Sequence, residues 1–374
     1  FRNKKDEKDY GYTNLSNCLK KSNGDYVNIL MHDDVLHETK VERMMEYFLS
    51  IPEVVLVTSS RNRIDENGKI LPPEWPFNRL FENDTILSGY DFCRLCITNH
   101  VNLIGEPSTV LFKKKYLDTG YGYFNGERIH CISDLATWFA VLQHGKCVYI
   151  SDALSSFRVH DKQNSNNPNV MVQAVPAWYK LLKNCYELGI IQLLEEYKKM
   201  VKDWLGNLVP TAQKYIEGGY SIDNEIKSQI VESFNEGIKD IFTKELAYNH
   251  ECIMCGKKVE RFLPYQYKRH KSDIINKYQI IESDTDNFSC PHCNCHDRTR
   301  HIVMYFNRMN IWKNCILGKS ILHIAPESHL QRIISQLNVK EYVCGDLNPA
   351  NETVKKIDIT NIPYKDNYFD FVIC

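Results

Sequence analysis

Two adjacent acids, Asp33 and Asp34, follow an apolar run from Tyr26 to Met31. The run contains β-branched residues and follows the turn-forming pair Asn23-Gly24, a pattern typical of a buried parallel strand. Acids at the carboxyl end of such a strand lie where open α/β sheets bind ligands. A carboxylate pair in a buried crevice is costly unless a cation or hydrogen-bond donors compensate it, and a divalent cation with oxygen ligands is a suitable partner, so the pair indicates a metal site. Alternatively, either Asp could cap the helix expected from Thr39 to Phe48.

A second group with chemical potential is a pair of C-x2-C motifs separated by 34 residues. Two such motifs supply four thiolates in the tetrahedral geometry of structural zinc, although the intervening loop is longer than the common spacing. Cys295, His292 or His296 could replace one ligand. A redox role is the alternative, but neither motif is expected at a strand-to-helix junction. The predicted zinc ligands are Cys252, Cys255, Cys290 and Cys293.

The third group lies near the end of the chain. A strand and turn from Lys319 to Glu327 lead to a helix and then to the strand Tyr342–Asp346, which ends in an acid. An acid at the end of the second strand is where such folds hold ribose hydroxyls. Asp358 and the apolar run Tyr368–Cys374 follow.

The elements that must position these groups alternate between helix and strand over residues 1–165, which predicts an α/β fold. The expected helices are Asn14–Lys21, Ser88–Thr98 and Ser133–His144, and the expected strands are Val54–Ser59 and Cys147–Ile150, with a hairpin-type turn at Asp65–Gly68. From Val170 to Asn249, apolar residues recur at intervals of three and four residues, which predicts a helical spacer.

The chain therefore divides into four expected parts: an α/β domain at 1–165, a helical spacer at 166–249, a zinc-knuckle segment at 250–301 and a partial second α/β domain at 302–374. A polar stretch, Asp161–Asn169, is the expected first linker. No internal repeat is visible.

Composition narrows the class of partner. The formal charge is −1 and the pI is about 6.9, so no global field attracts nucleic acid or anionic membrane. The basic, aromatic run Phe262–Lys271 would fit nucleic acid, but acids follow it closely. No apolar run is long enough to span a membrane, and no secretory leader is seen. With five of 14 cysteines between Cys252 and Cys295, we expect a reducing, cytoplasmic setting that includes the inner face of the membrane.

Residues 1–165 resemble the family-2 type of inverting glycosyltransferases with the GT-A fold. His32 stands where that family usually carries the first acid of its D-x-D motif. The family's opening strand and nucleotide-binding loop would precede Phe1, so we expect this chain to be a fragment. The segments that carry the resemblance, in the family's order, are Asn14–Asn17 with Ser22–Tyr26, His32–Asp34, Ile104–Ser108, Ser133–Trp138, and Phe157–His160 with Gln163–Ser165.

The resemblance implies transfer of a sugar from a nucleotide-diphospho-sugar to a glycan or lipid-linked acceptor. It places Mn²⁺ or Mg²⁺ at Asp34, with Asp33 beside it and His160 as a further ligand or a solvated loop residue. Such a metal neutralises charge on the leaving diphosphate. Asp134 would be the base that deprotonates the acceptor, and it could also cap its own helix. The implied acceptor-side residues are Glu106, Pro107 and Ser108.

The end of the chain resembles class I S-adenosylmethionine-dependent methyltransferases with a cysteine-rich segment before the Rossmann-like domain. The matching segments are Cys290–Arg300, Lys319–Glu327 and Ile359–Asp370. The resemblance implies that S-adenosylmethionine binds with Asp346 on its ribose, Asp358 near its adenine and Glu327 in the first loop. Ala325-Pro326-Glu327 replaces the usual Gly-x-Gly loop. The chain stops inside the expected fourth strand, so this domain is expected to be incomplete.

Together these patterns predict a metal-assisted, inverting glycosyltransferase in a bifunctional protein of polysaccharide biosynthesis. One alternative is a methyltransferase whose first domain only binds sugar. A non-enzymatic alternative is a zinc-stabilised scaffold.

Overall fold

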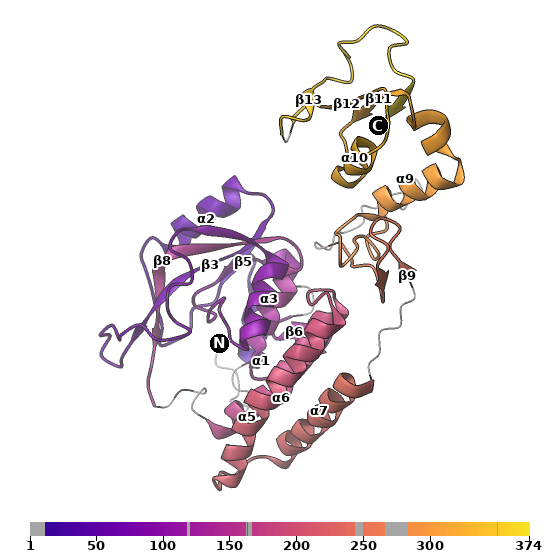
Figure 1. Cartoon of the computed structure of the whole chain (residues 1–374). Coiled ribbons are helices and arrows are strands. Elements are labelled where there is room, and N and C mark those ends of the chain that lie inside the picture. The colour runs from indigo at the N-terminus through magenta and orange to yellow at the C-terminus, as the bar shows by residue number, and fades with distance from the viewer. Residues whose placement is uncertain are drawn as a thin grey trace. The chain divides into compact units, whose positions relative to one another are not determined.

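The computed structural model describes residues 12–117, 120–161, 163, 167–243, 250–265, 283–349 and 351–374. These residues fall into two compact units (Figure 1). Unit 1 takes in the described residues up to 243, and unit 2 takes in those from 250 onward. The expected helical spacer thus lies in the same compact unit as the first α/β region.

Unit 1 is built on a mixed, six-stranded sheet in the order β1-β5-β3-β8-β2, with β4 also paired to β8. Strands β3 and β8 run parallel, and every other pair in this sheet is antiparallel. The strands are β1 (Tyr26–Asn28), β2 (Val35–Leu36), β3 (Val54–Ile64), β4 (Thr85–Ser88), β5 (Leu111–Lys113) and β8 (Lys146–Arg158).

A bulge divides β8 into two halves. Ser59 of β3 pairs with Ile150 of β8, but the next residue, Ser60, pairs with Ala153. Ser151 and Asp152 of β8 therefore have no partner on β3. Before the bulge β8 pairs with β4, and after it β8 pairs with β2. Asp84 fixes the bulge by accepting hydrogen bonds from the backbone and hydroxyl of Ser151. Since a bulge bends its strand, the sheet curls and the end of β8 turns toward β2.

The prediction of a buried parallel strand from Tyr26 to Met31 is wrong. Strand β1 covers only Tyr26–Asn28, is half-buried and pairs antiparallel with β5 at the edge of the sheet. Asn28 ends the pairing because its side-chain amide donates to the carbonyls of Ser108 and Val110, at 3.2 and 2.7 Å. The chain then turns through Asp33 and Asp34.

The helices of unit 1 agree with the sequence-based expectation. They are α1 (Tyr12–Lys21), α2 (Lys40–Ser50), α3 (Gly89–Asn99), α4 (Ser133–Leu142), α5 (Pro168–Glu187), α6 (Leu194–Glu217) and α7 (Asn224–Thr243). The hydroxyl of Ser88 caps α3, and His100 ends it in the left-handed conformation. Strand β2 intervenes before α2, whose N-cap residue is Thr39, so neither Asp33 nor Asp34 caps this helix.

Helices α5, α6 and α7 pack against one another and against the sheet domain. The hydroxyls of Tyr179 and Tyr197 both contact the carboxylate of Asp240 on α7. Arg94 on α3 forms an ion pair with Glu196 on α6 at 2.6 Å. A short helix Lys114–Tyr116 and the hairpin of β6 (Tyr123–Phe124) and β7 (Glu127–Arg128) complete unit 1.

Unit 2 combines a cysteine-rich segment with a four-stranded parallel sheet in the order β13-β12-β11-β14. The segment contains the hairpin of β9 (His250–Glu251) and β10 (Lys258–Val259), and α9 (Asp297–Arg308) joins it, through a π-helical turn at Trp312–Ile316, to the sheet. The sheet consists of β11 (Ser320–Ile324), β12 (Glu341–Asp346), β13 (Lys355–Lys356) and β14 (Phe371–Ile373), with α10 (Ser328–Ser335) after β11.

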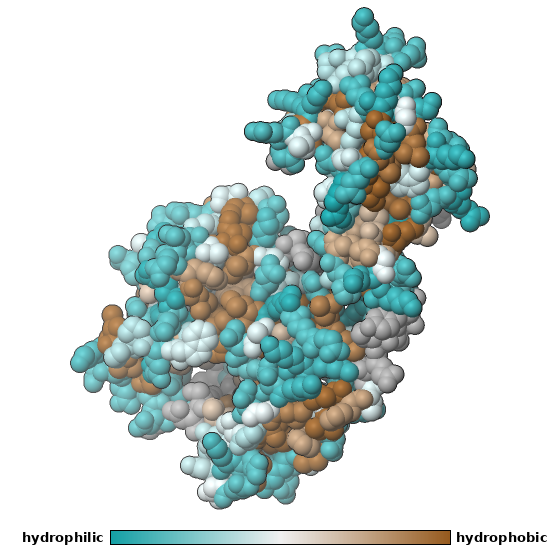
Figure 2. Space-filling model, viewed as in Figure 1, coloured by the Kyte–Doolittle hydropathy of each residue, from teal (hydrophilic) through white to brown (hydrophobic). Residues whose placement is uncertain are grey.

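Among the described residues, no helix has the length and apolar character needed to cross a bilayer. Apolar side chains do gather on the exposed surface of α7 (Figure 2), where Val231, Phe234, Ile238 and Phe242 recur at helical spacing.

Candidate functional site

Four carboxylates from three separate segments are linked by electrostatic interactions: Asp33 and Glu106 both act on Asp34, and Glu106 also acts on Asp134. We call Asp33, Asp34, Glu106 and Asp134 the acidic site. Burial raises the pKa of Asp34, and the charges of Asp33 and Glu106 raise it further. Burial also raises the pKa of Asp134 to about 6, again with a contribution from Glu106. The structure therefore brings these predicted residues into electrostatic contact.

Asp34 and Asp33 have different partners. The Asp34 carboxylate accepts the backbone N–H of Arg158 at 3.2 Å and a hydrogen bond from Ser108, and both lower its pKa. Asp33 instead contacts His160, with 3.0 Å between Oδ2 and Nε2. The predicted further ligand thus lies beside Asp33 rather than Asp34.

Asp33 and His160 offer two adjacent ligand atoms for a divalent cation. Within the described parts of the chain, no third His, Cys, Asp or Glu atom converges with them closely enough to form a complete protein cage. The pair combines one carboxylate oxygen with one imidazole nitrogen, whereas Mg²⁺ is usually bound by one or two carboxylates together with phosphate oxygens and water. Asp33 and His160 therefore supply at most part of the ligand set of a metal ion.

Arg158 holds the turn that carries Asp33. Its Nε donates to the Asp33 carbonyl at 2.8 Å, and its Nη1 donates to the carbonyls of Asp65 and Glu66 at 2.8 and 3.0 Å. The hairpin-type turn predicted at Asp65–Gly68 is confirmed, with Asp65 N–H bonded to the Lys69 carbonyl. One guanidinium thus ties three chain segments together.

The loop predicted to lie on the acceptor side is anchored by a buried ion pair. Arg61 Nε lies 2.6 Å from Glu106 Oε2, and the Arg61 side chain is only 2% exposed. Ser108 is buried, accepts the N–H of Met31 at 2.9 Å and so links this loop to the segment before Asp33. Pro107 lies half-buried between them.

Asp134 occupies the first turn of α4 but is not its N-cap, which is Ile132. Its Oδ1 accepts the N–H of Leu135 and its Oδ2 accepts the amide of Asn102, both at 2.8 Å. Asn102 is itself held in a reciprocal pair of hydrogen bonds with Gly105. The carboxylate is therefore fixed in orientation, and its raised pKa gives it greater basicity than an exposed aspartate.

Sequence reasoning missed three residues that build this site. Arg61 and Asn102 are described above, and the third is Lys40, which is 1% exposed and donates to the Thr109 carbonyl at 2.7 Å. Burial lowers the pKa of Lys40 to about 7. The Asn-x-x-Gly spacing of Asn102 and Gly105 is a turn signal that could have been used. Nothing local marks Lys40 or Arg61 as buried.

The four cysteines predicted to bind zinc converge in unit 2. The ligand atoms of Cys252, Cys255, Cys290 and Cys293 all lie within 4.8 Å of one another. The Sγ atoms of Cys252 and Cys293 are 3.8 Å apart, and those of Cys255 and Cys290 are 3.9 Å apart. A tetrahedron with metal–sulfur bonds of about 2.3 Å has edges of about 3.8 Å. The group therefore fits a metal ion such as zinc.

Both knuckles have the same backbone conformation. In the first, Cys252 N–H bonds to the Lys257 carbonyl and Gly256 N–H bonds to the Cys252 carbonyl, at 2.9 and 2.8 Å. In the second, Cys290 N–H bonds to the Cys295 carbonyl and Asn294 N–H bonds to the Cys290 carbonyl, at 3.0 and 2.8 Å. Gly256 and Asn294 each have positive φ, at 65° and 55°. Cys295, His292 and His296 do not belong to the converging group.

The cysteine-rich segment is bonded to the unit that contains the parallel sheet. His329 on α10 contacts the Cys293 carbonyl through Nε2 at 2.8 Å. Met254, between the first two cysteines, packs both against the cysteine cluster and against the core of α9, α10 and β11.

The three residues predicted to bind S-adenosylmethionine lie at three places in unit 2. Asp346 ends β12 and accepts the N–H of Asn348 at 2.8 Å. Asp358 accepts from the backbone and hydroxyl of Thr360, which lower its pKa. Glu327 contacts buried His323 at 3.1 Å, so its carboxylate already has a partner. In the loop that replaces Gly-x-Gly, Ala325 has a φ of 49°, a conformation that favours glycine.

No family model matches the chain, and no curated protein is significantly similar to it.

We predict that Cys290→Ser abolishes binding of one zinc ion per chain and unfolds the knuckle segment, because the remaining three thiolates leave the tetrahedron incomplete. Elemental analysis of the purified protein, together with circular dichroism, measures both effects. Cys295→Ser is the matched control and should retain the metal. A wild-type protein purified without metal would contradict the assignment.

We predict that the free energy of unfolding of Lys40→Met, relative to the wild type, is greater at pH 6 than at pH 9, because the substitution removes a buried charge whose cost is present only at low pH. The pKa of Lys40 is depressed in the folded state, so its charge destabilises the fold at low pH and this cost disappears as the pH rises through about 7 toward 10. Urea unfolding at pH 6 and pH 9 should therefore show that the stability of the variant relative to the wild type decreases as the pH rises. Exposed Lys69→Met should show no such dependence, and an equal loss at both pH values would refute the prediction.

Proposed function

We propose that unit 1 catalyses metal-assisted transfer of a sugar from a nucleotide-diphospho-sugar to a hydroxyl acceptor, with inversion at the anomeric carbon. The observation that carries the proposal is the acidic site, in which Asp134 has a pKa of about 6 and shares its surroundings with Glu106, while Asp33 and Asp34 approach from another segment. Carboxylates with different partners in one site suit a division between base and metal ligand.

Asp134 is suited to the role of base. An acceptor hydroxyl must lose its proton as it attacks the anomeric carbon, and a carboxylate of raised pKa takes that proton more readily. The contacts from Asn102 and Leu135 fix the direction of the carboxylate oxygens. Direct attack on the face opposite the leaving diphosphate gives inversion.

Asp33 and His160 are the residues we propose to hold Mn²⁺ or Mg²⁺. The metal, when bound, would neutralise negative charge on the leaving diphosphate. Arg158 would keep Asp33 in position through its bond to the Asp33 carbonyl. Asp34, bonded to Ser108 and Arg158, would maintain the turn and contribute negative charge close to the metal.

We predict that Asp134→Asn lowers the rate of sugar transfer by a factor of about 10²–10⁴ while donor binding stays nearly unchanged, since the amide cannot accept the acceptor proton. The wild-type rate should rise with pH through about 6 and then level off, because the base must be ionised. Radiolabelled transfer assays and donor titrations measure the two quantities.

The same variant has a stability signature. The pKa of Asp134 is raised in the folded state, so ionisation destabilises the fold, and this cost grows as the pH rises from about 4 to 6. The stability gain of Asp134→Asn should grow over the same range. Asp91→Asn, in the first turn of α3, is the matched control. Unchanged turnover in Asp134→Asn would remove this residue from the mechanism.

A second candidate function belongs to unit 2. We propose that its parallel sheet is part of a methyltransferase that binds S-adenosylmethionine. Strands β12 and β13 lie on one side of β11, and β14 lies on the other side, so the order in which strands are added reverses at β11. In open α/β sheets, nucleotides bind at such a switch point, at the carboxyl ends of the strands. Asp346, half-buried at the end of β12, is the residue that we expect to accept hydrogen bonds from the ribose hydroxyls.

We predict that Asp346→Asn weakens binding of S-adenosylmethionine by about tenfold or more, because hydrogen bonds to a charged acceptor contribute about 1.5–3 kcal/mol. Isothermal titration calorimetry measures the change, and the exposed Asp366→Asn serves as the control. If neither this cofactor nor a nucleotide sugar binds the complete protein, the scaffold alternative replaces both proposals.

A further inference from the structure

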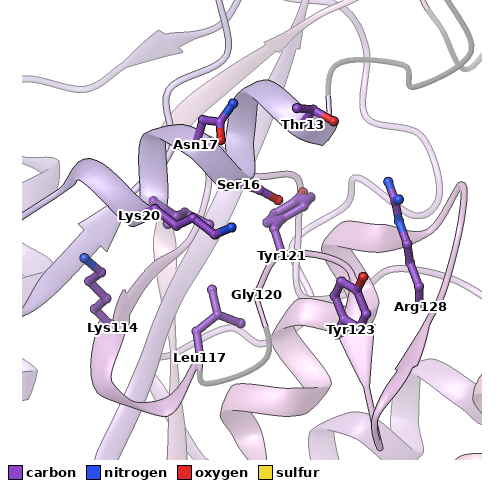
Figure 3. Close-up of a pocket in the computed structure, with 11 residues that line it drawn as sticks. Thr13, Ser16, Asn17, Lys20, Lys114, Leu117, Gly120, Tyr121, Tyr123 and Arg128 are labelled. Atoms are coloured by element: carbon purple, nitrogen blue, oxygen red, sulfur yellow. The ribbon is translucent and has the colours of Figure 1, made fainter. Parts of the chain in front are cut away.

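Two surfaces of unit 1 have no part in the functions proposed above: a cavity beside α1 and the outer face of α7. Figure 3 shows the cavity between α1 and the segment from Lys114 to Arg128. Two of its cations already have partners, because the Lys114 amine donates to the Ser22 carbonyl and Arg128 also takes part in an interaction. The outer face of α7 differs, since its large apolar side chains are exposed.

Helix α7 has two apolar faces. On the inner face Ile226 and Ile230 are buried, and a Cβ on Gly237 would lie 3.0 Å from the ring of Trp204 on α6, so the helix packs closely against its neighbour. The outer face carries four large apolar side chains that are between 36% and 76% exposed (Figure 2). We call this set the α7 stripe, and it consists of Val231, Phe234, Ile238 and Phe242.

The spacing of the α7 stripe suits a second helix. Steps of three and four residues place the four side chains in one row along the helix. Contiguous apolar patches on the surface of a protein commonly mark interaction sites. A row with this spacing packs well against another row with the same spacing, because the side chains of each helix fit between those of the other. A second copy of α7 has such a row.

The α7 stripe is self-complementary when two copies lie antiparallel. A two-fold axis midway along the stripe would bring Val231 of one copy near Phe242 of the other, and Phe234 near Ile238. The larger side chain then meets the smaller one at each end. Val231 also borders an open hollow in the surface of α7, which the ring of Phe242 from the second copy could enter.

The charges beside the α7 stripe follow the same symmetry. Glu232 and Lys239 are exposed on one flank of the stripe, and neither takes part in an ion pair within the described ranges. They are separated by about 10.5 Å of helix, which is too far for them to pair within one copy. In the antiparallel arrangement, Glu232 lies within about 3 Å, measured along the helix axis, of Lys239 from the second copy. Two-fold symmetry creates two such pairs.

We propose that α7 is a self-association surface, through which two copies of this chain form an antiparallel dimer with two-fold symmetry. The dimer covers the α7 stripe and pairs Glu232 with Lys239 at two places. It does not depend on the proposed sugar transfer. Because one helix from each copy makes a small interface, we expect reversible association with a dissociation constant in the micromolar range.

Sedimentation velocity of the complete chain, at several micromolar concentrations, tests the proposal. The wild type should pass from monomer to dimer as its concentration rises. Phe242→Ser should weaken the dimer by about tenfold or more, because it removes the most exposed side chain of the α7 stripe. This side chain is 76% exposed, so we expect the variant to fold, which circular dichroism checks. A wild type that stays monomeric at every concentration would overturn the proposal.

Charge reversal tests the antiparallel register. Glu232→Lys alone and Lys239→Glu alone should each weaken the dimer by about tenfold, because each variant places like charges opposite one another at two places. The double variant Glu232→Lys/Lys239→Glu should dimerise like the wild type, since it restores both pairs with their signs exchanged. If the double variant does not recover, the proposed arrangement is wrong.

Lys199→Glu is the matched control. Lys199 is exposed on α6, so this variant makes the same change in charge on another helix. It should leave the dimer unchanged. An equal loss in this control would mean that net charge governs association, and a dimer that keeps its full affinity in Phe242→Ser would mean that another surface forms it. Either result contradicts the proposal.

Discussion

The parallel pairing of β3 with β8 is the constraint on which unit 1 depends. It buries the apolar side chains of both strands and sets where their carboxyl ends emerge. The bulge in β8 then lets one strand serve two neighbours, β4 before it and β2 after it. As a result Arg158, at the end of β8, reaches the turn of Asp33, and Arg61 of β3 reaches Glu106. The acidic site is thus assembled by a sheet rather than by a single motif.

Gathering four carboxylates creates a repulsion that the surrounding groups must reduce. Each acid has a different source of compensation: a buried guanidinium for Glu106, an amide for Asp134, backbone and hydroxyl donors for Asp34, and an imidazole for Asp33. Fixed dipoles and hydrogen bonds leave the oxygens charged and oriented, whereas a full ion pair neutralises them. Glu106 is therefore the least available of the four for chemistry.

The sequence predicted features that depend on neighbouring residues better than features that depend on residues distant along the chain. Helices α1, α3 and α4 were predicted because apolar periodicity, and for α3 the capping residue Ser88, are local signals. The four cysteines were predicted because their spacing encodes the knuckle geometry. The strand at Tyr26 was predicted wrongly, since its apolar run did not reveal that Asn28 bonds to a loop 80 residues away. The buried positions of Lys40 and Arg61 likewise depend on distant partners, and no local pattern distinguishes a buried lysine from an exposed one.

The packing of Met254 has a consequence for how unit 2 unfolds. One side chain belongs to two hydrophobic clusters, so neither the cysteine cluster nor the α9–α10–β11 core can open without exposing apolar surface of the other. The hydrogen bond between His329 and the Cys293 carbonyl connects the same two regions. Cooperative units are defined by such shared contacts. Unit 2 should consequently melt in a single transition, so a metal ion bound by the four cysteines would stabilise the parallel sheet as well as the knuckles.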